Sequence, residues 1–157
     1  MASSEVQDHI RRSPQDVYAY LRDLNHLPEW SGFVLEAQNV RHPTVDREGQ
    51  YTAVGKFLGR RYELPFRAVV TEDPFTLLLE TTGGPIPHSW RYTVTPRGEG
   101  TDLKVVMEGD PGTFFKLAAP IVLKVVQRQM QTDMLALKEL LEAQAQEQAT
   151  AQGTLSR

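Results

Sequence analysis

The chain has four histidines, the side chains best suited to acid–base chemistry near neutral pH: His9, His26, His42 and His88. They lie far apart in the sequence and form no His-x-x-x-His pattern, so their spacing predicts no zinc or iron site. His88 stands two residues before Trp90, on the same side of the strand that this stretch predicts. His88 is therefore the candidate general base of the chain.

Two interpretations of His88 follow from its neighbours in the sequence. As a base it would remove a proton next to a carbonyl group, while Tyr62 or Tyr92 donates a hydrogen bond to the developing enolate. The simpler interpretation is structural. Pro85 and Pro87 prevent strand pairing just before His88, which would then be only the first residue of a strand, half exposed at a rim. The residues favour the simpler interpretation.

The inventory of residues excludes several other chemistries. There is no cysteine, so disulfides, thiolate metal sites and cysteine nucleophiles are excluded. The glycine-rich stretches at 83–85 and 97–100 lead into hairpins and not into a helix that could receive a phosphate. No Gly-x-Ser-x-Gly or Ser-x-x-Lys motif is present. We therefore expect neither a metal nor a cofactor.

Charge and hydropathy limit the partners. The 157 residues include 17 basic and 20 acidic side chains, scattered along the chain without the basic stripe of a nucleic-acid binder. The longest apolar stretch, near 117–126, is interrupted by Pro120 and Lys124 and is too short to span a bilayer. The first residues lack the apolar region of a secretory signal. We expect a soluble, cytoplasmic protein, with peripheral membrane contact left open.

The first elements are a strand and a helix. Val6 and Ile10 alternate with polar residues, which predicts a short strand. Asp8 shares their phase, an unfavourable place for a charge, and we expect it to mark a frayed strand start. Ser13 begins a capping box with Pro14 after it, so a helix starts there. Pro28 should end this helical region after at most one further short turn.

The middle of the chain is rich in β-branched and aromatic residues separated by short turn sequences. Such short connections favour antiparallel neighbours over helical crossovers. The pattern predicts strands near 33–41, 49–57, 60–72, 75–82, 88–96 and 102–109.

After residue 112 the apolar residues recur at helical spacing. The predicted stripe consists of Phe114, Ala118, Ile121, Val122, Val125, Met130, Met134, Leu137 and Leu141. Pro120 should kink or restart this helix. Residues 144–157 are polar, so we expect one domain over 1–143 followed by a frayed tail.

This order of elements predicts an α+β fold. A curved, largely antiparallel sheet of seven strands would wrap around the long C-terminal helix, with two short helices between the first two strands. The concave face of the sheet and the helix would then enclose the interior of the domain.

The same residues resemble the START-like or SRPBCC superfamily, and in particular its polyketide cyclase/dehydrase-like branch. The resemblance rests on "RRSPQDVYAYLRDLNHLPEWSGFV", on "SWRYTVTPRGEGTDLKV" and on the long helix after "DPGTFF". It implies a helix-grip fold with a ligand cavity between sheet and helix. Members of the superfamily bind lipids, quinones, polyketides and hormones, and some act as cyclases or aromatases. No invariant catalytic motif runs through the branch.

Strand periodicity then predicts which side chains face this cavity. In the strand that opens at His88, Trp90 and Tyr92 share one phase and Arg91 has the other. We take the aromatic phase as the inward one, and Leu77 and Leu79 as inward on the preceding strand. The candidate ligand-binding residues are Tyr62, Leu64, Phe66, Leu79, Trp90, Tyr92, Met107, Phe115, Ile121 and Val125.

Three functions remain open from the sequence. The leading hypothesis is a binding or carrier protein for a small hydrophobic molecule such as a lipid, a quinone or a polyketide-like compound. The first alternative is a cofactor-independent polyketide cyclase, aromatase or dehydratase with His88 as its base. The second alternative is an interaction or assembly factor that docks on a partner or a membrane surface. The aromatic residues could also simply fill the interior.

Overall fold

A computed structural model of the chain describes residues 2–42, 47–72, 75–109 and 119–155. Its strands are β1 (Ala2–Ile10), β2 (Glu36–Arg41), β3 (Glu48–Phe57), β4 (Arg60–Glu72), β5 (Phe75–Thr81), β6 (His88–Arg97) and β7 (Gly100–Gly109). Its helices are α1 (Pro14–Leu21), the short 3-10 helix η1 (Leu24–His26), α2 (Leu27–Trp30) and α3 (Ala119–Leu155).

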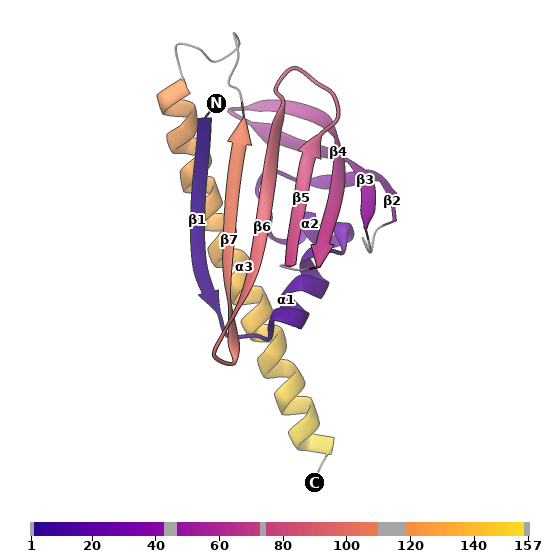
Figure 1. Ribbon diagram of the computed structural model, residues 1–157, viewed down its shortest axis with the longest axis vertical. Helices are drawn as coiled ribbons and strands as arrows, with labels where there is room; N and C mark the ends of the chain where they lie inside the picture. Colours follow the sequence, from indigo (N-terminus) through magenta and orange to yellow (C-terminus); the bar gives the residue numbers. More distant parts are fainter. Residues whose placement is uncertain (1, 43–46, 73–74, 110–118, 156–157) are drawn as a thin grey trace.

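The strands form one antiparallel sheet in the order β1-β7-β6-β5-β4-β3-β2. Neighbours along the chain are neighbours in the sheet, except that β1 pairs with β7, so that Val6 lies opposite Val105. The helix α3 lies along one face of the curved sheet, as Figure 1 shows. This arrangement confirms the predicted helix-grip fold.

The segment between β1 and β2 is more helical than the sequence predicted. The side chain of Ser13 accepts a hydrogen bond from the Asp16 N–H, so α1 begins as expected. Beyond α1, however, both η1 and α2 form. Asp23 caps η1 by accepting from the Asn25 N–H, and Pro28 lies in the first turn of α2, where its missing N–H costs nothing. Pro28 therefore helps to start α2, whereas the sequence predicted only that it ends the helical region.

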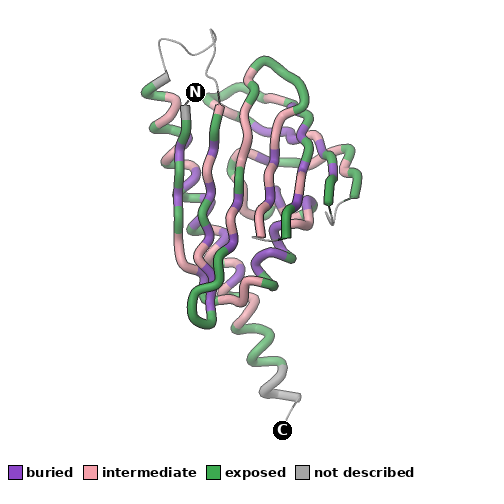
Figure 2. The backbone as a smooth tube through the Cα atoms, in the orientation of Figure 1, coloured by how far each residue is buried: buried purple, intermediate pink, exposed green. Residues whose placement is uncertain are grey.

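The strands present the predicted residues to α3. On β5 the side chains of Leu77 and Leu79 are each 2% exposed, and on β6 Tyr92 and Val94 are buried while Arg91 is exposed. The alternation of buried and exposed positions along each strand is visible in Figure 2. The phase predicted from the aromatic residues of β6 is thus the inward one.

The expectation that Asp8 marks a frayed strand start is wrong. The strand β1 pairs with β7 through Ile10, and Asp8 lies opposite Leu103 inside that ladder. Its carboxylate accepts from Lys138 Nζ on α3 at 3.4 Å. An ion pair between sheet and helix therefore replaces the water that this half-buried charge would otherwise require.

The helix α3 has Pro120 in its first turn and continues to Leu155. Residues 110–118 lie outside the described residues, so the stripe positions Phe114 and Ala118 and the kink or restart at Pro120 stay predictions. The segment expected to fray is helical as far as Leu155. Its last turns extend beyond the sheet in Figure 1, and the side chains described there are mostly exposed. Arg12 holds the helix near the sheet, because its Nη1 donates to the Leu141 carbonyl at 3.2 Å.

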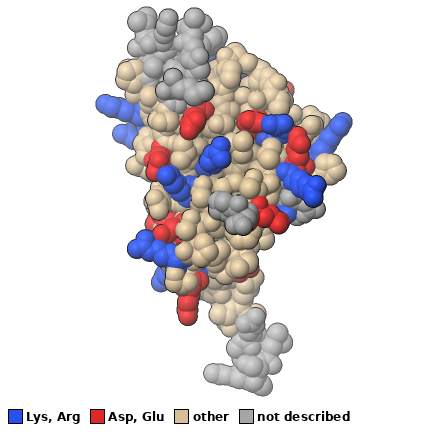
Figure 3. Space-filling model, viewed as in Figure 1, with Lys and Arg blue, Asp and Glu red and all other residues tan. Residues whose placement is uncertain are grey.

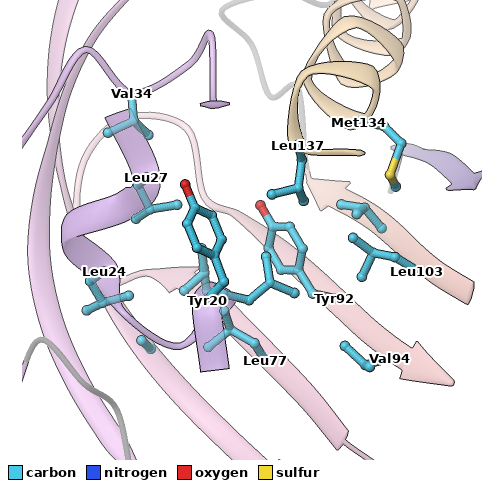
Figure 4. Packing of buried hydrophobic residues seen from close by; sticks show 14 of the residues in the cluster. Tyr20, Leu24, Leu27, Val34, Leu77, Tyr92, Val94, Leu103, Met134 and Leu137 are labelled. Carbon is cyan, nitrogen blue, oxygen red and sulfur yellow. The ribbon is translucent and has the colours of Figure 1, made fainter. Parts of the chain in front are cut away.

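One end of the interior is completely filled. Figure 4 shows buried side chains from α1, α2, the sheet and α3 in contact around Leu77 and Leu103. Here Ile10, Leu24 and Leu141 have no exposed surface. This packed end closes the space between the sheet and α3 and leaves the other end to form a site.

Candidate functional site

A cavity of about 490 Å³ lies between the concave face of the sheet and α3. Its walls come from the strands β3 to β7, from α2 and the segment after it, and from the first half of α3. Most of the lining side chains are apolar or aromatic, as is usual for sites that bind small organic molecules. From α3 the lining residues are Val122, Leu123, Val126, Met130, Asp133, Met134 and Leu137.

Most of the side chains that strand periodicity selected line this cavity. Those present in its walls are Tyr62, Leu64, Phe66, Leu79, Trp90, Tyr92, Met107 and the candidate base His88. Phe115 lies outside the described residues. The cavity brings the eight residues of β4, β5, β6 and β7 together, and their contact with a ligand stays a prediction.

The two remaining candidates need a correction, because Ile121 and Val125 do not line the cavity. Ile121 is 67% exposed and Val125 is 36% exposed on the outer side of α3. Nine residues make about two and a half helical turns, so Ile121 lies opposite the buried Met130 on the helix. The first described turn of α3, residues 119–123, is apolar on all sides, so the predicted stripe included residues that face outward there. Val122 and Val126 face the cavity instead.

His88 is half-buried at the start of β6 and borders the cavity. Its Nδ1 lies 2.8 Å from the Ile86 carbonyl, to which it donates a hydrogen bond, so Nε2 carries the free lone pair of the neutral ring. The ring meets Phe66 and Trp90 edge-on, at centroid distances of 5.4 and 6.0 Å. Burial lowers the pKa of His88, and the bond to the Ile86 carbonyl opposes this shift. Burial thus favours the neutral form of the imidazole.

Aromatic rings pack in pairs around the cavity and do not close it. The rings of Phe33 and Trp90 are 5.0 Å apart, and those of Tyr51 and Phe66 stack at 5.2 Å. Trp30 contacts Tyr92 edge-on at 5.9 Å. Each ring is thus supported by a neighbour in the wall.

Two tyrosine hydroxyls in the cavity wall lack a protein partner. Tyr51 and Tyr92 are 3% and 5% exposed, yet in the described part of the chain neither hydroxyl has a hydrogen-bond partner. Burial raises the pKa of both phenols. Tyr62 differs, because its hydroxyl donates to the Phe33 carbonyl. Its pKa is raised to about 12, first by burial and then by the charge of Asp133.

The close approach of Tyr62 to Phe33 depends on a glycine. A Cβ atom at Gly55 would lie 2.2 Å from the Phe33 carbonyl oxygen and 2.5 Å from the Tyr62 hydroxyl. No side chain fits there without displacing one of these groups. Gly55 thus allows the wall of β3 and β4 to meet the segment after α2.

Sequence reasoning missed Asp133, the carboxyl group in the cavity wall. Asp133 is 6% exposed, and its Oδ1 accepts from the Gly32 N–H at 2.9 Å and from Gln129 Nε2 at 2.8 Å. Burial raises the pKa of Asp133, although both hydrogen bonds oppose this shift. A signal was present in the sequence: Asp133 comes three residues after Met130 and four before Leu137, within the apolar stripe of α3.

Apart from the buried Asp133, the charged residues of the lining lie at the rim of the cavity. Arg60 and Arg61 at the start of β4 are exposed, and Arg61 forms an ion pair with Glu63 at 2.8 Å. In the view of Figure 3, positive and negative side chains are interspersed over the side of the sheet. The interior of the cavity is thus much less charged than its surroundings.

Two findings concern metals and membranes. Within the described ranges, no three His, Asp or Glu side chains are grouped so that they could hold a metal ion. No helix of the described residues is long and apolar enough to cross a membrane.

The curved sheet, the long helix gripped by it and the apolar cavity between them define a protein of the helix-grip fold. Within that class, the chain belongs to the family described as "Polyketide cyclase / dehydrase and lipid transport", whose profile matches residues 1–142. No curated protein sequence matches the chain.

Solved structures share this fold at low sequence identity. A protein from Thermus thermophilus has a TM-score of 0.78 and 17% identity, over 90% of this chain and 98% of that one. A STAR-related lipid transfer protein from Xanthomonas axonopodis has a TM-score of 0.72 and 16% identity, over 87% and 84%. The di-domain ARO/CYC StfQ from the steffimycin biosynthetic pathway has a TM-score of 0.73 and 15% identity. The match covers 91% of this chain but 51% of StfQ.

Proposed function

We propose that the protein binds and carries a small hydrophobic molecule in the cavity between the sheet and α3. The observation that carries this proposal is the cavity itself, about 490 Å³ of space lined mainly by apolar side chains. Its volume lies within the range of about 300–1,000 Å³ that is typical of sites for drug-sized ligands. Among the solved structures of the same fold, one is named a lipid transfer protein.

The size of the cavity argues against a dry, empty space. A dry apolar void costs about 24 cal/mol per Å³, so 490 Å³ would cost about 12 kcal/mol. That cost approaches the total stability of an ordinary domain, which is about 5–15 kcal/mol. The space therefore holds water or a ligand. An apolar ligand that displaces water from these walls gains the free energy of burying its own surface.

Two neighbouring valines of α3 provide a matched test. Val126 is 7% exposed and lines the cavity, whereas Val125 is 36% exposed and faces outward. Val126→Trp should fill the cavity and weaken binding of the neutral dye Nile red by about tenfold or more, since the dye loses its buried contacts. Val125→Trp adds the same side chain outside the cavity and should leave binding within about twofold. Fluorescence titration measures both.

Native mass spectrometry of the freshly purified protein complements the titration. We expect one ligand-sized adduct per chain, lost in Val126→Trp and retained in Val125→Trp. If wild-type protein binds no dye and carries no adduct, or if both tryptophan variants bind like the wild type, the cavity is not a ligand site.

The geometry of His88 supports a second candidate function, a cofactor-independent cyclase, aromatase or dehydratase. The neutral ring has its Nδ1 proton committed to the Ile86 carbonyl, which leaves Nε2 free to accept a proton beside the cavity. Such a base could abstract the proton next to a carbonyl of a bound β-keto compound.

Hydrogen–deuterium exchange tests this candidate without knowledge of the substrate. The protein is mixed with an apolar β-keto ester in D₂O, and NMR follows loss of the α-proton signal. Wild type should accelerate the exchange above the buffer rate, and His88→Gln should return it to that rate because glutamine is no base. Equal rates with both proteins would remove His88 as a catalytic residue.

A further inference from the structure

Three polar side chains line the otherwise apolar cavity with atoms that have no protein partner. The Tyr51 and Tyr92 hydroxyls are two of these groups, at 3% and 5% exposure. The third is Asp133, 6% exposed: both of its hydrogen bonds reach Oδ1, and Oδ2 has no partner within the described residues. No buried side-chain oxygen of the described residues lacks a partner, so these three unpaired oxygens are open to the cavity space, where a ligand or water can pair them.

The three groups line the same cavity from three elements, Asp133 from α3, Tyr92 from β6 and Tyr51 from β3. Burial and then the charge of Asp133 raise the pKa of Tyr92, while burial and then Tyr92 raise that of Tyr51. Figure 4 shows the Tyr92 ring projecting from β6, with its hydroxyl directed toward Leu137 of α3. Asp133 stands four residues before Leu137, hence on the same side of that helix. Asp133 and Tyr92 therefore face the same cavity from α3 and β6, and Tyr51 faces it from β3.

The carboxyl group of Asp133 is held in a fixed orientation. Gly32 N–H and Gln129 Nε2 both donate to Oδ1, which leaves Oδ2 free to accept from another group. Gly32 permits this arrangement, because a Cβ atom there would lie 2.1 Å from Gln129 Nε2 and 3.2 Å from Asp133 Oδ1. The only cations among the described lining residues, Arg60 and Arg61, are exposed at the rim. The interior thus offers a hydrogen-bond acceptor without an opposing positive charge.

We propose that Asp133, together with Tyr92, determines the specificity of the cavity by holding a hydroxyl group of an otherwise apolar ligand and excluding a carboxylate at that end. A hydroxyl can donate to Asp133 Oδ2 and accept from the Tyr92 hydroxyl, so it pairs both groups. A carboxylate can only accept, and it would lie beside a second carboxyl group in an environment of low polarity. This inference rests on the proposed ligand-binding function.

Two probes of the same shape test the inference. 2-Naphthol carries a hydroxyl, 2-naphthoate carries a carboxylate, and isothermal titration near neutral pH gives the affinity of each. Wild type should bind 2-naphthol about tenfold or more tightly than 2-naphthoate. In Asp133→Asn the side-chain amide can keep the Gly32 bond through its oxygen and present an N–H group where Oδ2 was. The ratio of the two affinities should then fall by about tenfold.

Two further variants separate this role from a structural one. Glu139→Gln removes one negative charge from an exposed position of α3 and should leave the affinity ratio unchanged. Tyr92→Phe removes the second partner of the hydroxyl and should weaken 2-naphthol binding by about fivefold or more, with a smaller effect on 2-naphthoate. It also keeps the inference testable if Asp133→Asn fails to fold.

The outcomes distinguish this inference from the function on which it rests. If both probes bind and the ratio of their affinities is the same in wild type, Asp133→Asn and Tyr92→Phe, then Asp133 and Tyr92 do not determine specificity. The proposed carrier function would be unaffected by that result. If neither probe nor Nile red binds wild type, both proposals fail. A wild-type preference for 2-naphthoate would also overturn the inference.

Discussion

The two ends of the interior between the sheet and α3 are built from different residues. At the filled end Leu24, Leu103 and Leu141 are fully buried. Even the polar Thr101 is fully buried there, and its hydroxyl donates to the Arg12 carbonyl at 2.8 Å. At the hollow end, aromatic rings surround open space, and the Tyr51 hydroxyl has no partner within the described residues.

This difference assigns stability to one end of the domain and ligand binding to the other. Close packing and paired polar groups at the filled end contribute free energy of folding. The hollow end contributes less free energy of folding, because the side chains in its walls lack packing partners on the cavity side. A ligand that enters the cavity restores the missing contacts. The filled end should therefore dominate stability, and the hollow end should dominate binding.

The largest expected effect comes from shortening one leucine at each end. Leu77 and Leu79 are both 2% exposed inward residues of β5, but only Leu79 lines the cavity. Leu77→Ala should cost the upper part of the usual range of about 2–5 kcal/mol, and Leu79→Ala about 1–2 kcal/mol less, because the space beside Leu79 is already open. Urea unfolding of ligand-free protein measures both. Equal costs would contradict the contrast between the two ends.

Polar groups should show the same contrast on a smaller scale. Thr101→Val removes the hydroxyl that pairs with the Arg12 carbonyl and should cost about 1–2 kcal/mol. Tyr51→Phe removes a hydroxyl without a partner in the described residues, so stability should change by less than about 0.5 kcal/mol. Thermal and urea unfolding report both changes. A large loss in Tyr51→Phe would show that its hydroxyl is paired in solution.

The carboxyl group of the hollow end should make stability depend on pH. Because burial raises the pKa of Asp133 above the 3.8 of an unfolded chain, the unfolded state loses this proton first as the pH rises. The contribution of Asp133 to stability is therefore fully present below pH 3.8 and lost as the pH rises through its folded pKa.

Asp133→Asn removes this titration and should be more stable than wild type at neutral pH, with the advantage shrinking as the pH falls toward about 3.8. Urea unfolding at several pH values measures the difference. A difference that stays constant with pH would mean that the carboxyl group is not destabilised by its surroundings.

The smallest effect is expected at the end of α3. A chain that stops after Ala145 keeps Leu141, whose carbonyl accepts from Arg12, and Gln144, whose side chain also accepts from Arg12. Its unfolding free energy should lie within about 0.5 kcal/mol of the full chain, since the removed residues with described side chains are exposed. A chain that stops after Leu140 loses the fully buried Leu141 and should be several kcal/mol less stable. A large loss with the longer chain would give the tail a structural role.

Much of the fold could be predicted because inward-facing and outward-facing residues alternate along a β strand. Trp90 and Tyr92 on one phase and Arg91 on the other were sufficient to orient β6, and its neighbours followed. A capping box located α1, and the change to helical spacing located α3. Each of these signals lies within a few residues of the element that it specifies.

The errors in the predicted site come from α3, whose first described turn is apolar on every side. The inward face of that segment is set by distant residues such as Met130 and Leu141, which the local pattern around Ile121 does not show. Asp133 was missed for a related reason, because a charged residue is normally assumed to face water. Its partners, Gly32 and Gln129, are brought to it only by the tertiary fold.

The pairing of the first strand with the last has a consequence during synthesis on the ribosome. Val6 lies opposite Val105, so β1 leaves the ribosome long before its partner strand exists. At about 5–20 residues per second, the wait is on the order of 5–20 s. For that time the alternating apolar edge of β1 is unpaired and open to association with other chains. We therefore expect the nascent chain to be most prone to association through residues 2–10 until β7 emerges.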